Sequence, residues 1–301
     1  MQKADAAGNA HTDQGFGQAI LLVLLANFLF SLVDTSTKWL AIAGLTAFQL
    51  AFMRYAMHFA ITLGESVARG AHYVPFAPEV RNIILVRAIA LVSATLVNFI
   101  ALEELPLSVT ASIMFLSPVL VCLFARVLLN EPLTARRLAA VALGLVGVTI
   151  IINPFGAELN WYAVMMLYPA SGLAFYLVLT RMLADKVSPL AMQSSMGMVG
   201  TIALAPFALF AWNTPSSSTE WVLLFSIGAF AWAGHEVLTR AHAMREASAL
   251  APFSYSLVLY LIFFGWLIFD SIPTLNTIIG ALCVVTAGFI AFGGRRSAVV
   301  A

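Results

Sequence analysis

The chain has 301 residues, of which 61% are apolar and only 10% are charged. Soluble domains carry about a quarter charged residues and under half apolar ones, and a mean hydropathy of +0.95 leaves more apolar surface than one core can hide. Lipid must therefore cover much of the outside, which excludes a cytosolic enzyme and a secreted module. The net charge is +1, and the chain has no basic run of the kind that binds nucleic acid.

Ten apolar runs are long enough to cross a bilayer. A hydrocarbon core about 30 Å thick needs about 20 helical residues, and a helix satisfies all of its backbone groups in lipid. Because the connections are short, the sequence predicts an all-α integral membrane protein with ten transmembrane helices. The runs cover residues 17–37, 45–64, 81–101, 107–128, 136–153, 160–181, 189–211, 219–239, 248–269 and 275–293.

The predicted loops differ in charge between the two sides of the membrane. If the N-terminus is cytoplasmic, twelve of the fifteen Lys and Arg residues fall on the cytoplasmic side. This bias follows the rule that positive residues stay inside. We therefore expect a multi-pass topology in which both tails, residues 1–16 and 295–301, are cytoplasmic.

The second half of the predicted bundle repeats the first. At an offset of 140 residues, the segment 108–129 falls over 248–269 with similar placement of small, aromatic and apolar residues. Ten helices divide into five plus five, and an odd number makes the two halves enter the membrane from opposite sides. We expect two inverted five-helix repeats, residues 17–154 and 155–294, around a central cavity that opens to either side.

The most specific passage of the sequence lies within the first repeat. The stretch from Ser108 to Pro154, in which the turn 130–134 (NEPLT) leads into an Ala- and Gly-rich helix with Gly144 and Gly147, resembles the EamA-type drug/metabolite transporter superfamily. Within it, the chain is similar to bacterial aromatic amino-acid exporters. The resemblance implies an inner-membrane exporter of small metabolites, above all neutral or aromatic amino acids, that works by alternating access without a cofactor. A monomer is compatible with the sequence.

Polar side chains inside transmembrane helices are costly, so each is a candidate for the functional site. Asn27, Asp34 and Lys38 share one face of the first helix. Arg54 lies about 13 Å deep in the second helix, and we expect a structural ion pair between Asp34 and Arg54. Arg87 lies near the cytoplasmic end of its helix, and we expect it to reach the lipid headgroups.

The eighth predicted helix carries the most suggestive polar face. His235-Glu236 begins like the zinc-protease motif HExxH, but Thr239 replaces the second ligand, so the sequence predicts neither a metal nor a catalytic site. A cavity for a neutral amino acid instead needs an aromatic lining with a few hydrogen-bonding groups. The substrate-binding candidates that fit this description are Asn27, Asn98, Ser112, Tyr168, His235, Ser254 and Tyr255.

Other functions remain open at this point. An exporter of another metabolite or a drug fits the same pattern. A channel is disfavoured because neither a selectivity-filter segment nor a ring of acidic residues is visible. An intramembrane enzyme is disfavoured because no acid–base constellation has the required spacing. The two cysteines, Cys122 and Cys283, lie in apolar segments without metal-ligand spacing and are expected to be small core residues.

Overall fold

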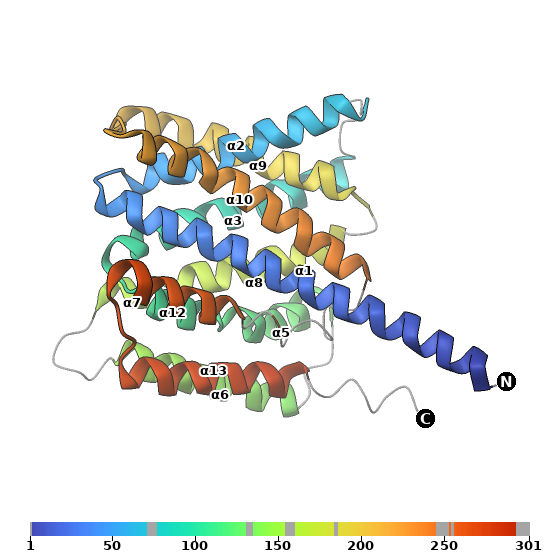
Figure 1. The fold of residues 1–301 in the computed structure, drawn as a ribbon. Coiled ribbons are helices and arrows are strands. Elements are labelled where there is room, and N and C mark those ends of the chain that lie inside the picture. Colours follow the sequence, from blue (N-terminus) through green and yellow to red (C-terminus); the bar gives the residue numbers. More distant parts are fainter. Residues whose placement is uncertain are drawn as a thin grey trace.

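The structure is a computed structural model that describes residues 2–70, 77–130, 135–153, 160–183, 186–244, 253 and 256–292. Within these ranges the regular structure is helical and contains no strand. The long helices lie side by side along a common direction (Figure 1). This arrangement is that of an all-helical membrane bundle, as the composition predicts.

The helices follow the apolar runs of the sequence, and polar side chains mark several of their starts. Thr46, Asn160 and Ser188 each accept a hydrogen bond from a backbone N–H in the first turn of the helix that follows. The helices are α1 (Gln2–Ile42), α2 (Ala47–Ala68), α3 (Pro78–Glu104), α4 (Leu107–Met114), α5 (Ser117–Leu128), α6 (Ala135–Ile152), α7 (Trp161–Met165), α8 (Leu167–Leu183), α9 (Pro189–Phe210), α10 (Ser218–Met244), α12 (Ser256–Phe269) and α13 (Leu275–Phe292).

Two features of the helices differ from the sequence-based expectation. The first helix begins at Gln2 and therefore includes the predicted tail, which contains no proline that would interrupt it. The spans predicted at 107–128 and 160–181 are each broken into two helices, α4 with α5 and α7 with α8. Pro118 and Pro169 lie just after these breaks and have no N–H to continue the helical hydrogen bonds.

The helices pack in pairs along the bundle. α1 packs against α10 and α12, α2 against α9 and α10, and α3 against α8 and α9, while α6 and α13 lie side by side at one edge (Figure 1). Small residues permit the closest contacts: a Cβ on Gly147 of α6 would lie 2.7 Å from the Gly280 carbonyl oxygen of α13, and one on Gly234 of α10 would lie 2.7 Å from the Phe30 ring of α1. Such close approach is typical of membrane helix packing.

The bundle has two ends, which we call proximal and distal. The proximal end is the one at which α1 begins and α13 ends; at the distal end α1 ends and α2 begins (Figure 1). Large apolar side chains such as Phe210 and Trp266 are exposed on the outside, where lipid would solvate them. Within the described ranges, six segments are long and apolar enough to span a membrane: Phe16–Ile42, Val80–Glu104, Leu107–Leu128, Trp161–Leu183, Pro189–Phe210 and Ser218–Ala241.

Candidate functional site

A group of polar side chains from α1, α2 and α3 lies deep in the bundle. On α3, Thr95 and Asn98 are three residues apart and therefore share one helix face. Arg54 of α2 donates from Nη1 to the Thr95 hydroxyl at 2.6 Å, and Asp34 of α1 accepts from the Asn98 amide at 3.5 Å. A single face of α3 thus holds a cation and an anion that come from two other helices.

The expected ion pair between Asp34 and Arg54 is not formed, although the structure describes both residues. Their charges are close enough to interact electrostatically, but each side chain has a neutral partner on α3 instead. Both are half-buried. Depth along a helix does not say which third helix offers hydrogen-bond partners to two side chains.

Aromatic rings surround the Arg54 guanidinium. Its central carbon lies 5.3 Å from the Tyr55 ring centre and 5.9 Å from that of Phe99, within the range of cation–π attraction. Tyr55 also bonds to the Thr95 hydroxyl at 2.8 Å. The Arg54 Nε–H is buried and has no hydrogen-bond partner among the described residues. This guanidinium is held in position while much of its donor capacity is unused.

A pair of histidines lies next to this group. The rings of His58 (α2) and His235 (α10) are 5.9 Å apart, centre to centre, and His235 also contacts the Phe30 ring at 5.0 Å. The Gln193 amide of α9 lies beside His58. Within the described parts of the chain, both imidazole Nε2 atoms and the indole N–H of Trp232 are buried without a partner. Because unsatisfied buried polar atoms are costly, the cluster is suited to bind a polar ligand.

Lys38 has a different environment at the distal end of α3. Its ammonium donates to the carbonyl oxygens of Leu102 and Leu105 at 2.9 and 2.8 Å and lies 5.7 Å from the Phe269 ring centre of α12. The side chain is buried. A cation at the C-terminus of a helix is stabilised by the exposed carbonyls and the helix dipole. Lys38 therefore ties α1, α3 and α12 together.

Arg87 does not reach the headgroups, contrary to the sequence-based expectation. It is 2% exposed and donates to the hydroxyls of Thr180 and Tyr176, each at 2.7 Å, and to the Met192 carbonyl oxygen at 3.2 Å. The guanidinium also stacks on the Tyr176 ring at 4.3 Å. Neighbouring helices offer this side chain enough acceptors to hold it inside, so Arg87 joins α3 to α8 and α9.

Three further predicted site residues have hydrogen-bond partners other than the histidine pair. Asn27 donates to the Phe253 carbonyl oxygen and to the Ser256 hydroxyl at the start of α12. The Ser112 hydroxyl bonds to the carbonyl of its own helix at Ser108. Tyr168 is 52% exposed and bonds to the Ser93 hydroxyl of α3. Ser254 and Tyr255 lie outside the described residues.

Several residues of the site were absent from the sequence-based candidates. His58 was visible one turn after Arg54 on the second helix, but an isolated histidine carries little information. Tyr55, Thr95 and Gln193 are ordinary residues of apolar helices, and only packing shows that they surround the two charged side chains. No sequence signal in a single chain would have selected them.

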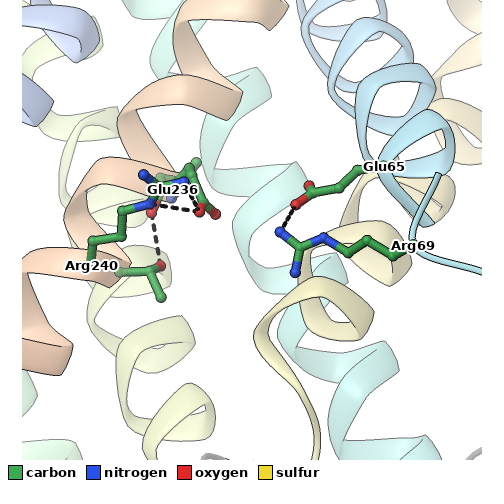
Figure 2. Close-up of polar contacts among 6 residues, drawn as sticks. Glu65, Arg69, Glu236 and Arg240 are labelled. Atoms are coloured by element: carbon green, nitrogen blue, oxygen red, sulfur yellow. Dashed lines mark hydrogen bonds and ion pairs between the residues drawn. The ribbon is translucent and has the colours of Figure 1, made fainter. Parts of the chain in front are cut away.

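The arrangement offers hydrogen-bond donors and acceptors of both charges without a reactive centre. Among the described residues, no three His, Cys, Asp or Glu side chains gather as metal ligands. Two further charged pairs, Glu65 with Arg69 and Glu236 with Arg240, lie near the proximal ends of α2 and α10, each within its own helix (Figure 2). The described interior therefore offers hydrogen-bonding and charged groups that could bind a polar ligand.

Comparisons with known proteins give a consistent family. The sequence profile of the EamA-like transporter family matches residues 17–153 and, a second time, residues 160–293. A solved crystal structure matches 93% of this chain and 99% of its own chain with a TM-score of 0.65. Its sequence identity is 18%, so that likeness concerns the fold alone.

Curated relatives cover nearly the whole chain. A riboflavin transporter of Brucella anthropi is 27% identical over 270 residues, which are 86% of this chain and 92% of that protein. The pseudopaline exporter CntI of Pseudomonas aeruginosa is 27% identical over 273 residues, 89% and 93% of the two chains. An S-adenosylmethionine uptake transporter of Rickettsia prowazekii is 25% identical over 282 residues, 90% and 92%. None of these three relatives is named as an amino-acid exporter.

Proposed function

Because the chain belongs to the EamA-like transporter family and is a membrane metabolite transporter rather than an enzyme, we propose that it works by alternating access between two inverted five-helix halves. The halves consist of α1 to α6 and of α7 to α13. The chain crosses the membrane ten times if α4 and α5 together form one broken span and α7 and α8 together form another. A substrate bound between the halves is then exposed to one side of the membrane at a time.

The observation that carries this proposal is the symmetry of helix packing. Exchanging the two halves in chain order turns the α2–α10 contact into the α9–α3 contact and the α1–α12 contact into the α8–α5 contact. It also turns the α1–α10 contact into the α8–α3 contact. All of these contacts are present. The α2–α9 and α6–α13 pairs map onto themselves, which is expected for elements on a two-fold axis.

We assign the proximal end to the cytoplasm of a bacterial inner membrane, since most Lys and Arg residues of the loops are then cytoplasmic. The transport direction is export, and neutral or aromatic amino acids are the proposed substrates. The lining that supports this substrate class is a set of aromatic and polar groups on α1, α2, α3 and α10. It comprises Asp34, Arg54, Asn98 and His235, together with Asn27 of α1, which donates to the Ser256 hydroxyl at the start of α12. Ser254 and Tyr255 stay in the proposed lining on the sequence argument alone.

Transport in proteoliposomes tests the proposal. The purified protein is reconstituted, and efflux of a labelled amino-acid panel is followed with and without a pH gradient, beside riboflavin and S-adenosylmethionine as competing substrates. Saturable efflux that is accelerated by the same substrate on the opposite side is expected. Conductance beyond carrier rates would indicate a channel, and the absence of transport for every compound would overturn the carrier assignment for these substrate classes.

A further inference from the structure

Asp34 and Arg54 are two opposite charges that face the same helix without pairing. Their partners, Asn98 and Thr95, are one turn apart on α3, so the two charges lie about one helical turn apart along that helix. Ionised side chains inside a membrane bundle normally pair with each other because an unpaired charge is costly there. The separation of these two charges therefore requires a reason.

Both charged groups retain unused hydrogen-bonding capacity. The Asp34 carboxylate has about four acceptor positions and one long contact, at 3.5 Å from the Asn98 amide nitrogen. The Arg54 guanidinium has five N–H donors. Among the described residues it donates to Thr95, and its Nε–H has no partner there. A molecule that bridged the two groups would satisfy both charges at once.

We infer that Asp34 and Arg54 bind the ammonium and the carboxylate of a zwitterionic substrate. This inference rests on the proposed function and names the chemistry of its binding site. The carboxylate of the ligand accepts from the guanidinium, which can hold it with two parallel bonds, and the ammonium donates to Asp34. An α-amino acid presents these two groups at one end and a variable side chain at the other.

The rest of the cluster indicates what side chain such a ligand carries. The rings of Phe30 and His235 are in contact, and Trp232 lies on the same face of α10 as His235, one turn away. These groups offer aromatic surfaces together with an unpartnered indole N–H and imidazole nitrogen. A planar aromatic side chain with a ring N–H would find stacking surface and a hydrogen-bond acceptor here.

Three ligands that share one ring separate the two charge interactions. Tryptophan is a zwitterion, indole-3-propionate keeps the carboxylate alone, and tryptamine keeps the ammonium alone. Binding to the purified full-length protein is measured as a concentration-dependent rise of the unfolding temperature. Tryptophan should bind about ten- to a hundredfold more tightly than either analogue, which is the usual effect of one charge-assisted hydrogen bond.

Substitutions then assign each charge to its residue. Arg54→Gln should reduce tryptophan and indole-3-propionate affinity by about tenfold or more and leave tryptamine almost unchanged. Asp34→Asn should reduce tryptophan and tryptamine affinity and leave indole-3-propionate almost unchanged. Arg69→Gln is the matched control, because it removes an exposed guanidinium from the same helix and should alter none of the three.

Distinct results would overturn this inference. Equal binding of all three ligands to the unsubstituted protein would do so, even if both variants failed to fold. Equal loss of all three ligands in Arg54→Gln and Asp34→Asn would show that the charges are structural only. Transport of riboflavin, which carries neither an ammonium nor a carboxylate, without any transport or binding of the indole series would reject the zwitterion site and preserve the carrier. Failure of all these compounds would instead count against the proposed function itself.

Discussion

The distal and proximal ends of α2 and α10 are held by different kinds of contact. At the distal end, Gln49 at the start of α2 exchanges two hydrogen bonds with the Asn213 backbone, just before α10, at 2.9 and 3.1 Å. Lys38 joins three helices nearby. Near the proximal ends, the ion pairs of α2 and α10 stay within one helix each (Figure 2).

This difference concerns the polar contacts that join helices at the two ends. An exposed ion pair four residues apart within a helix contributes about 0.3–0.5 kcal/mol to that helix and nothing to the contact between helices. A buried ammonium bound to backbone carbonyls, in contrast, must lose its partners before α1, α3 and α12 move apart. The distal hydrogen bonds therefore join different helices, whereas the proximal ion pairs of α2 and α10 do not.

Among the variants compared here, removal of the Lys38 ammonium should lower the free energy of unfolding most. Lys38→Met keeps the apolar stem but leaves the Leu102 and Leu105 carbonyls without their charged donor, so the free energy of unfolding should fall by about 3 kcal/mol. Thermal unfolding in detergent, followed by circular dichroism, measures the loss. Lys186→Met, which removes an exposed ammonium, serves as the control. A loss below that of the control would mean that the distal tie is unimportant.

Arg87 tests whether a buried cation also stabilises the bundle outside the distal end, because its hydrogen bonds join α3 to α8 and α9. Arg87→Lys keeps the charge but loses the planar fork that reaches both Thr180 and Tyr176, so stability should fall by about 2 kcal/mol. Unfolding of Arg87→Lys, Tyr176→Phe and the double variant measures the coupling between them. If the two effects add without interaction, the Arg87–Tyr176 contact does not carry the stabilisation that we assign to it.

Gln49 tests the distal contact between α2 and the segment before α10. Gln49→Leu removes both hydrogen bonds with Asn213, and we expect a loss of about 1–2 kcal/mol in the same unfolding assay. Leucine keeps a similar volume, so packing changes little. Gln18→Leu, at an exposed position of α1 outside this contact, is the control for the change of side chain alone. Equal stability of Gln49→Leu and the unsubstituted protein would refute this role.

The smallest effect is expected from the proximal ion pairs. Glu65→Gln and Glu236→Gln each remove the carboxylate of a pair that lies within one helix, and each should change the free energy of unfolding by less than about 0.5 kcal/mol. Both variants are compared with Lys38→Met in a single series. A loss of more than about 2 kcal/mol in either one would contradict the contrast between the two ends.

The positions of the helices could be predicted, because apolar length and turn residues are local properties. The small size of Gly147, which closely approaches Gly280 of α13, is likewise a local property, and small residues permit membrane helices to pack closely. The breaks inside the predicted spans were harder to predict from the sequence. Pro118 and Pro169 suggest kinks, but whether a proline bends a helix or divides it depends on the neighbouring backbone.

The partners of the buried charges could not be predicted in the same way. The depth of Arg87 from the end of its helix favours a position at the headgroups. The side chain instead donates to Tyr176 and Thr180, which lie four residues apart on the neighbouring helix α8. Depth correctly brought Asp34 and Arg54 to the same level, but α3 determines their actual partners. Such contacts depend on crossing angles and rotation, which a single sequence does not specify.

The accessibility of one interior position tests the central claim, a binding site that alternates between the two sides. In a variant without Cys122 and Cys283, Asn98→Cys is treated with an impermeant thiol reagent in vesicles of each orientation. We expect modification from the proximal side, slowed by tryptophan, and faster modification from the distal side once Lys38→Met is added. Rapid distal modification with Lys38 intact, or a distal rate that Lys38→Met leaves unchanged, would contradict the account.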